Sequence, residues 1–123
     1  MKIMIVDDEK DVEILFWQQF RKEVRDGLID LCYAFSGEEA LEYLGSQTPP
    51  DVVCILSDIN MPGINGLELL KAVKEKYPQI RVSMITAYGD DYNFKTAMST
   101  GAEHYFTKPI DFVRIKKDML NFS

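Results

Sequence analysis

The chain has 123 residues, of which 46% are hydrophobic and 28% are charged, as is ordinary for one globular domain. Its net charge of −6 argues against direct nucleic-acid binding, which requires a basic face. The sequence lacks both an apolar run of membrane-spanning length and a signal peptide. Cys32 and Cys54 stand far apart in apolar stretches, as small buried residues of a reducing compartment do. We therefore expect a cytoplasmic protein without a membrane segment.

Short β-rich runs alternate with helical stretches along the chain. Apolar runs that stop at polar residues predict strands, and apolar residues three and four apart predict helices. In chain order we predict strand 2–6, helix 11–24, strand 28–35, helix 36–44, strand 51–56, helix 65–77, strand 80–85, helix 91–100, strand 103–107 and helix 110–120. Five β/α units with short connections predict one doubly wound α/β domain: a five-stranded parallel sheet with five helices on its two faces.

Several side chains in the predicted helices allow a more local prediction. Ser36 is expected to cap the helix 36–44, with Glu39 at capping-box spacing. Phe94 and Met98 lie four residues apart and are expected in the core. Ile14 lies near the margin of the first helix's apolar face, as does Trp17. Two explanations stay open for this pair, namely packing at a helix margin and docking of a partner protein.

Polar residues stand at the carboxyl ends of four predicted strands, where ligands bind in open α/β sheets. The first strand leads into Asp7 and Asp8, the third into Asp58, the fourth into Thr86 and the fifth into Lys108. In a parallel sheet these ends share one edge, so three carboxylates should meet there. Two like unit charges 4 Å apart repel by about 4 kcal/mol at an effective dielectric of 20. Either the pKa values of the three carboxylates are raised, or a cation binds there.

The ligand types at this edge indicate which cation and which chemistry to expect. Carboxylate oxygens without His or Cys favour a hard ion such as Mg²⁺, with Mn²⁺ as an alternative. A phosphoryl group needs a point charge and a hydroxyl donor, which Lys108 and Thr86 can provide. Asp58 between the metal and these groups can act as a nucleophile and form an aspartyl-phosphate.

Four segments carry a resemblance to a known family, namely "IVDDE" (5–9), "SDINMPGINGLELL" (57–70), "SMITAYG" (83–89) and "GAEHYFTKP" (101–109). With them, the sequence resembles the chemotaxis-type receiver domain of response regulators in two-component signalling, over essentially the whole chain. The resemblance implies a flavodoxin-like fold with strand order 2-1-3-4-5. It also implies one receiver domain over residues 1–123, without an output domain in that range.

The resemblance implies a role for each residue of the predicted pocket. Asp58 would be the phosphoacceptor, and the Mg²⁺ ligands would be Asp7, Asp8, Asp58 and the backbone carbonyl of Asn60. Contacts to the phosphoryl group are implied for Thr86, Ala87 and Lys108. Thr86 and Tyr105 would form the switch, and the peptide bond before Pro109 would be cis.

One position departs mildly from the family pattern. Tyr88 is a bulky aromatic residue two positions after Thr86. In this family that position and the position of Asn60 modulate hydrolysis of the acyl phosphate. We predict that the ring shields the phosphoryl group from water and slows autodephosphorylation.

The implied function is that of a phosphoacceptor in a phosphorelay, not of a classical enzyme, although the domain would assist its own phosphotransfer and dephosphorylation. The implied partners are a sensor histidine kinase or a histidine phosphotransfer protein, followed by an effector or a fused output domain. Phosphorylation would change the face formed by the fourth predicted helix, the fifth strand and the fifth helix, and could drive dimerisation.

Rival functions make different demands on the same residues. A phosphatase of the haloacid-dehalogenase type needs a second acid two residues after its nucleophile, but Lys10 follows Asp8 and Asn60 follows Asp58. A flavin module needs a Ser/Thr/Gly-rich phosphate loop after the first strand, where this chain is acidic. A receiver-like adaptor that acts without phosphorylation stays open as the alternative.

Overall fold

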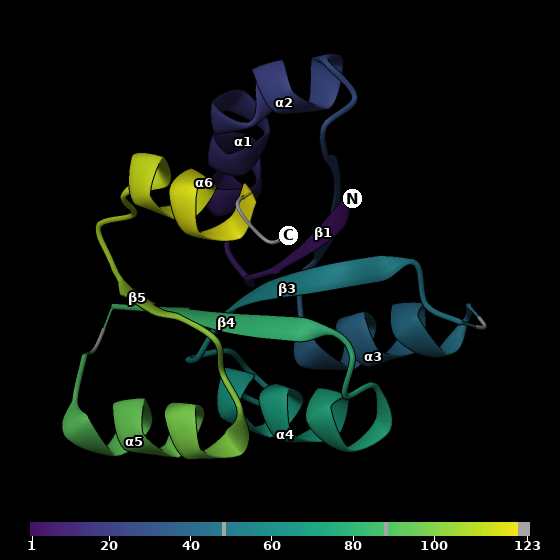
Figure 1. Cartoon of the computed structure of the whole chain (residues 1–123). Helices are drawn as coiled ribbons and strands as arrows, with labels where there is room; N and C mark the ends of the chain where they lie inside the picture. Colours follow the sequence, from purple (N-terminus) through teal and green to yellow (C-terminus); the bar gives the residue numbers. More distant parts are fainter. Residues whose placement is uncertain (48, 88, 121–123) are drawn as a thin grey trace.

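The computed structural model describes residues 1–47, 49–87 and 89–120, and in them the strands form one parallel sheet in the order β2-β1-β3-β4-β5, as predicted. The strands are β1 (Lys2–Val6), β2 (Asp30–Ala34), β3 (Val52–Asp58), β4 (Arg81–Thr86) and β5 (Tyr105–Thr107). The helices are α1 (Lys10–Gln19), α2 (Arg21–Arg25), α3 (Gly37–Gly45), α4 (Gly66–Lys76), α5 (Asp91–Thr100) and α6 (Phe112–Leu120). Figure 1 shows α1, α2 and α6 on one side of the sheet and α3, α4 and α5 on the other.

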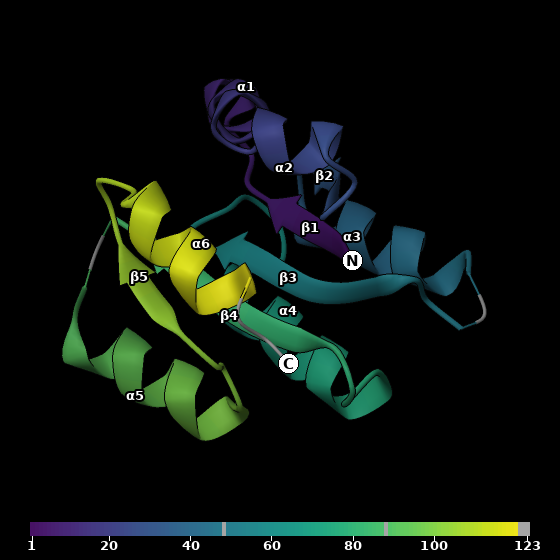
Figure 2. The same ribbon diagram turned by 45° about the horizontal axis from the view of Figure 1, so that its top comes forward.

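The sheet separates two apolar cores, and alternate residues of each central strand enter different cores. In β1, Ile3 and Ile5 pack in the cluster that contains residues of α1 and α6. Met4 and Val6 pack in the cluster beneath α3, α4 and α5. Figure 2 shows β1, β3 and β4 side by side in the middle of the fold. This double coverage requires near-continuous apolar strands, which is what the sequence provides.

The first predicted helix, 11–24, is divided into α1 and α2, so the prediction of five helices is wrong by one. Phe20 lies between the two helices with φ −102° and ψ 9°, close to the bridge region. Its N–H still donates to the Phe16 carbonyl over 2.9 Å. The buried Phe20 ring stacks on the ring of Phe16, with 5.9 Å between centroids. Phe112 of α6 contacts both of these rings, and apolar spacing alone does not reveal this contact between distant segments.

Helix ends follow local sequence signals. The Ser36 hydroxyl oxygen accepts a hydrogen bond from the Glu39 N–H over 3.0 Å, as its predicted capping role requires. A complete capping box lies at the start of α4, where Asn65 and Glu68 bond each other's backbone N–H at 2.9 Å each way. It fixes the point at which the loop after β3 becomes helix.

Some apolar side chains lie outside the cores. The core prediction for Phe94 and Met98 is wrong, because they are 46% and 40% exposed and α5 buries chiefly Ala97. Within the otherwise buried β3, Val53 is 43% exposed. Ile14 and Trp17 on α1 are exposed by 55% and 40%, so neither is a core residue.

The prediction that both cysteines are buried is confirmed for Cys54 and only partly for Cys32. Cys54 is fully buried and Cys32 is half-buried, and both are free thiols. Burial raises the pKa of Cys54 to about 12 and that of Cys32 to about 11. Both therefore remain protonated near neutral pH.

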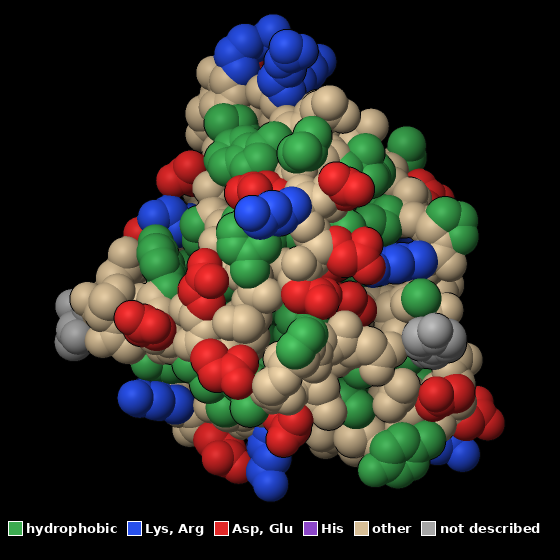
Figure 3. Space-filling model, turned by 180° about the vertical axis from the view of Figure 1, so that it is seen from behind, with side chains coloured by type: hydrophobic (Ala, Val, Ile, Leu, Met, Phe, Trp, Pro, Cys, Tyr) green, Lys and Arg blue, Asp and Glu red, His purple; other side chains and the backbone are tan. Residues whose placement is uncertain are grey.

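The surface reflects the acidic composition of the chain. Figure 3, which views the molecule from behind, shows acidic side chains scattered across the middle of that face and a group of basic side chains at its top. Among the described residues, no helix combines the length and apolarity needed to cross a bilayer.

Candidate functional site

Asp58 is the last residue of β3, the central strand of the sheet, and is only 7% exposed. Its Oδ1 accepts a hydrogen bond of 2.8 Å from the Ile59 N–H, which fixes the orientation of the carboxylate. Gly66 lies against the Asp58 carbonyl oxygen, where a Cβ would not fit. The strand and the start of α4 thus hold Asp58 at the carboxyl edge of the sheet.

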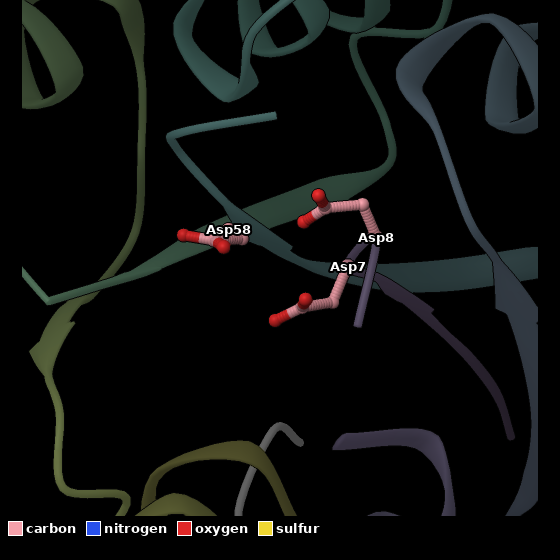
Figure 4. Close-up of side chains that lie close together, drawn as sticks. All are labelled: Asp7, Asp8 and Asp58. Atoms are coloured by element: carbon pink, nitrogen blue, oxygen red, sulfur yellow. The ribbon is translucent and has the colours of Figure 1, made fainter. Parts of the chain in front are cut away.

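Two further carboxylates from the end of β1 face Asp58 (Figure 4). Asp7 and Asp8 each offer one carboxylate oxygen such that these oxygens and one of Asp58 all lie within 4.8 Å of one another. Asp7 is 3% exposed, and its Oδ1 accepts from the Glu9 N–H over 2.9 Å. Asp8 is exposed to solvent. A donor set made only of oxygens, in which two of the three carboxylates are buried, fits a hard divalent cation such as Mg²⁺.

Lys108 brings one positive charge to these carboxylates. Its Nζ lies 3.5 Å from Asp7 Oδ2 and 3.6 Å from Asp58 Oδ2. The residue follows β5, and its N–H donates to the Thr86 carbonyl over 2.8 Å at the end of β4. The peptide bond between Lys108 and Pro109 is cis. One ammonium therefore serves two buried carboxylates from two different strands.

The positive charge of Lys108 does not offset the effect of burial on the pKa values of Asp7 and Asp58. Burial raises the pKa of Asp58, although Lys108 and the backbone N–H groups of Ile59 and Asn60 act to lower it. Burial also raises the pKa of Asp7, and the charge of Asp58 adds to that rise. For Lys108, burial acts to lower the pKa, but the charges of Asp7 and Asp58 outweigh it and raise it. The carboxylates are thus under-compensated, which favours binding of a cation.

The other predicted site residues lie around this centre. Thr86 is buried and ends β4, Ala87 follows it and is exposed, and Asn60 is an exposed residue of the loop after β3. Tyr105 begins β5 and packs edge-on against Phe94 of α5, with 5.3 Å between ring centroids. The predicted modulator Tyr88 lies outside the described residues.

Two residues that support the site were not anticipated from the sequence. The Tyr33 hydroxyl on β2 donates to the Glu9 carbonyl over 3.1 Å and so contacts the turn that carries Asp7 and Asp8. The Glu38 carboxylate on α3 accepts from the Ile64 N–H over 3.2 Å in the loop after β3. Both contacts join segments more than 20 residues apart, so local sequence patterns give no signal for them.

Comparison with known proteins places the chain among two-component signalling proteins. The family model "Response regulator receiver domain" matches residues 3–120. Sporulation initiation phosphotransferase F of Bacillus subtilis is 34% identical over 115 residues, which cover 94% of this chain and 87% of that protein. The DNA-binding transcriptional regulator NtrC of Escherichia coli is 40% identical over 110 residues, which cover 89% of this chain. The chain spans only about a fifth (22%) of the length of NtrC.

Solved structures agree on the fold. Chemotaxis protein CheY4 of Vibrio cholerae aligns with a TM-score of 0.81 at 24% identity, covering 96% of this chain and 94% of that one. A CheY-like receiver domain protein from Methanospirillum hungatei aligns with a TM-score of 0.85 at 24% identity, covering 96% and 89% of the two chains. With the family match over nearly all of its length, this chain belongs to the receiver domains of two-component response regulators.

Proposed function

We propose that residues 1–123 form one receiver domain in which Asp58 accepts a phosphoryl group from a phosphohistidine. The donor is a sensor histidine kinase or a histidine phosphotransfer protein. One observation carries the proposal: Asp58 ends the central strand with two further carboxylates within 4.8 Å and Lys108 3.6 Å from its Oδ2. A buried carboxylate in this setting is reactive and oriented, since Oδ1 is held by the Ile59 N–H and Oδ2 faces Lys108.

The residues of the chain divide the work of the transfer. Asp58 Oδ2 attacks the phosphorus in line, a P–O bond forms, the P–N bond to the donor imidazole breaks, and the imidazole nitrogen takes a proton from solvent. Lys108 stabilises charge on the phosphoryl oxygens, and Thr86 donates its hydroxyl to one of them. Asp7, Asp8, Asp58 and the Asn60 carbonyl hold Mg²⁺, which when bound neutralises charge on the phosphoryl group. The product is an aspartyl-phosphate, and the domain assists its own modification without being a classical enzyme.

The test uses a small phosphodonor, which requires no knowledge of the cognate kinase. Incubation with acetyl phosphate and Mg²⁺ should add one phosphoryl group, read by intact mass. The Asp58→Asn variant should remain unmodified, and so should the wild type in a chelator. A wild type that stays unmodified under these conditions would favour an adaptor that acts without phosphorylation, and retention of the modification in Asp58→Asn would place it elsewhere.

A hollow beside Lys108 supports a docking surface for the phosphodonor protein. It has a volume of about 450 Å³ between α1 and the segment that leads into α6. Its lining is largely apolar, formed by Val12, Leu15, Pro109, Ile110 and Phe112 together with the polar residues Glu9 and Lys108. Ile14 and Trp17 do not line it. We therefore favour Leu15, which is 37% exposed, over Trp17 as the contact on α1.

Phosphotransfer from a protein donor separates docking from chemistry. Leu15→Ala should slow transfer from a histidine phosphotransfer protein about fivefold to tenfold, as loss of ~1 to 1.4 kcal/mol implies. The same variant should react normally with acetyl phosphate. Trp17→Ala is the matched control on the same helix, and an equal or larger loss there would move docking to the outer side of α1.

The output of the proposed switch is the face of α5, β5 and α6, which correspond to the fourth predicted helix, the fifth strand and the fifth predicted helix. Thr86 and Tyr105 would couple phosphorylation to this face, since Tyr105 lies on β5 of the face and Thr86 ends the neighbouring strand β4. A partner or a second copy that binds the phosphorylated arrangement must by linkage also favour phosphorylation. An effector that binds equally well with and without beryllofluoride would contradict this coupling.

A further inference from the structure

The loop between β3 and α4 carries Asn60, whose carbonyl is a metal ligand in the proposed function. Both ends of this loop are fixed to the elements that they join. At its end the Gly66 N–H donates to the Ile59 carbonyl over 2.8 Å, and Asn65 caps α4. The outer part of the loop itself belongs to neither a strand nor a helix.

A contact from α3 holds that outer part. The Oε2 atom of Glu38 accepts a hydrogen bond from the Ile64 N–H over 3.2 Å. The same carboxylate lies against Gly63, in the space that a Cβ would occupy, where φ is +76°. The Ile64 side chain in turn packs against Gly37, the residue before Glu38. Three successive features thus join the first turn of α3 to the loop.

We propose that Glu38 is a positioning residue that holds the loop after β3 in its metal-binding arrangement before the cation arrives. This inference rests on the proposed function, because it gives Glu38 a role toward the Mg²⁺ that the carboxylates would bind. A ligand that is already oriented gives up less conformational freedom on binding, so loss of the contact weakens affinity without removing any ligand.

A purely local role for Glu38 has to be separated from this one. Glu38 lies in the first turn of α3, where any carboxylate interacts favourably with the helix dipole. Glu39 is the neighbouring first-turn carboxylate and is also exposed. Because Glu38 is the residue that accepts the hydrogen bond from the loop, Glu39→Ala is a matched control that removes the same charge from the same helix end.

The test measures Mg²⁺ affinity by calorimetry for the wild type and three variants. Glu38→Ala should weaken Mg²⁺ binding about threefold to tenfold. This loss is no larger than the smallest losses seen when an outer-shell partner of a metal site is removed, because the contact is exposed. Glu38→Gln should restore most of the affinity, since its amide oxygen can still accept from Ile64. Glu39→Ala should bind as the wild type does.

Two further readouts fix the interpretation. In Glu38→Ala the Ile64 amide should exchange its hydrogen faster, and the rate of phosphorylation at saturating Mg²⁺ should match the wild type. Equal affinity in Glu38→Ala and the wild type would overturn the inference, as would equal losses in Glu38→Ala and Glu39→Ala. A wild type that binds no Mg²⁺ and takes no phosphoryl group would instead overturn the proposed function.

Discussion

The strand β1 has a charged cluster at each end, and the two clusters are compensated differently. At its start, Lys2 Nζ lies 2.8 Å from Asp51 Oδ2, 3.0 Å from the Tyr43 hydroxyl and 3.9 Å from Asp30 Oδ2. Hydrogen bonds to Asp51 and Tyr43 raise the pKa of Lys2, so its ammonium stays protonated. The carboxylates of Asp51 and Asp30 also stay partly in water, with side chains 48% and 67% exposed.

At the other end of β1 the carboxylates are buried and their charges are less well compensated. Asp7 and Asp58 have side chains that are 4% and 7% exposed, and both share the ammonium of Lys108. Their pKa values are raised chiefly by burial. Paired charges at the start of the strand stabilise the fold, whereas under-compensated charges at its end would favour cation binding at a cost in stability.

The largest expected effect on stability comes from removing the Lys108 ammonium, which lies at the end of β1. Lys108→Met should lower the free energy of unfolding of the metal-free protein by about 1–3 kcal/mol, less than the 3–5 typical of a fully buried pair, because the side chain is 23% exposed. Millimolar Mg²⁺ should reverse the loss, since it supplies the missing positive charge. Urea unfolding in chelator and in Mg²⁺ measures both.

The comparison variant is at the start of the same strand. Lys2→Met also removes an ammonium from between two carboxylates, but those carboxylates can return to water. Its loss of stability should be smaller and independent of Mg²⁺. If Mg²⁺ rescued both variants equally, the two clusters would not differ in the way described.

Removing a negative charge should have opposite signs at the two ends. Asp58→Asn should stabilise the metal-free protein by about 1–2 kcal/mol, a share of the roughly 4 kcal/mol by which unit charges 4 Å apart repel at a dielectric of 20. Asp51→Asn should instead destabilise it, because it removes the nearest partner of Lys2. Unfolding midpoints in chelator test both signs, and a destabilised Asp58→Asn would contradict the view of the site as under-compensated.

The pH dependence of stability follows from the raised pKa values at the site. Below the usual pKa of 3.8, Asp58 is protonated in both the folded and the unfolded chain. As the pH rises, the unfolded chain loses this proton first, so the carboxylate's contribution to stability falls until the pH passes the higher folded pKa. Metal-free wild type should therefore lose stability relative to Asp58→Asn as the pH rises from about 4 to the raised pKa of the folded state. A gain in the stability of the wild type relative to Asp58→Asn over this pH range would contradict a raised pKa of Asp58.

The sequence predicts the site better than its surroundings, for a physical reason. Asp7, Asp58 and Lys108 each stand at the end of a strand, and strand ends can be recognised from where an apolar run stops. A parallel sheet then brings these ends together whatever the helices do. The positions of these three side chains therefore depend on local patterns combined with one topological rule.

What the sequence does not reveal depends on packing between distant segments. At the helix break, Phe112 of α6 contacts the rings of both Phe16 and Phe20. On the other side of the sheet, α5 buries chiefly Ala97 and leaves Phe94 and Met98 exposed. The contact between Glu38 and Ile64 joins residues 26 apart. Glu38 taken alone is an ordinary first-turn carboxylate, so its contact with the loop is visible only in three dimensions.

The smallest expected effects come from a matched pair of tyrosine hydroxyls, one at each end of β1. Tyr43 accepts from Lys2 at the start, and Tyr33 donates to the Glu9 carbonyl over 3.1 Å at the end. Each Tyr→Phe change removes hydrogen bonds at the surface and should cost about 0.5–1 kcal/mol of stability. Only Tyr33→Phe should also weaken Mg²⁺ binding, because the Glu9 N–H orients Asp7.

Calorimetric titration with Mg²⁺ therefore distinguishes two variants that unfolding measurements cannot. A hydroxyl at the start of β1 contributes to a cluster that is already complete, so Tyr43→Phe should leave the metal affinity unchanged. A hydroxyl at the end contributes to the geometry of the carboxylates that we propose bind Mg²⁺. Equal Mg²⁺ affinities in the two variants would mean that the turn after β1 holds Asp7 in place without help from β2.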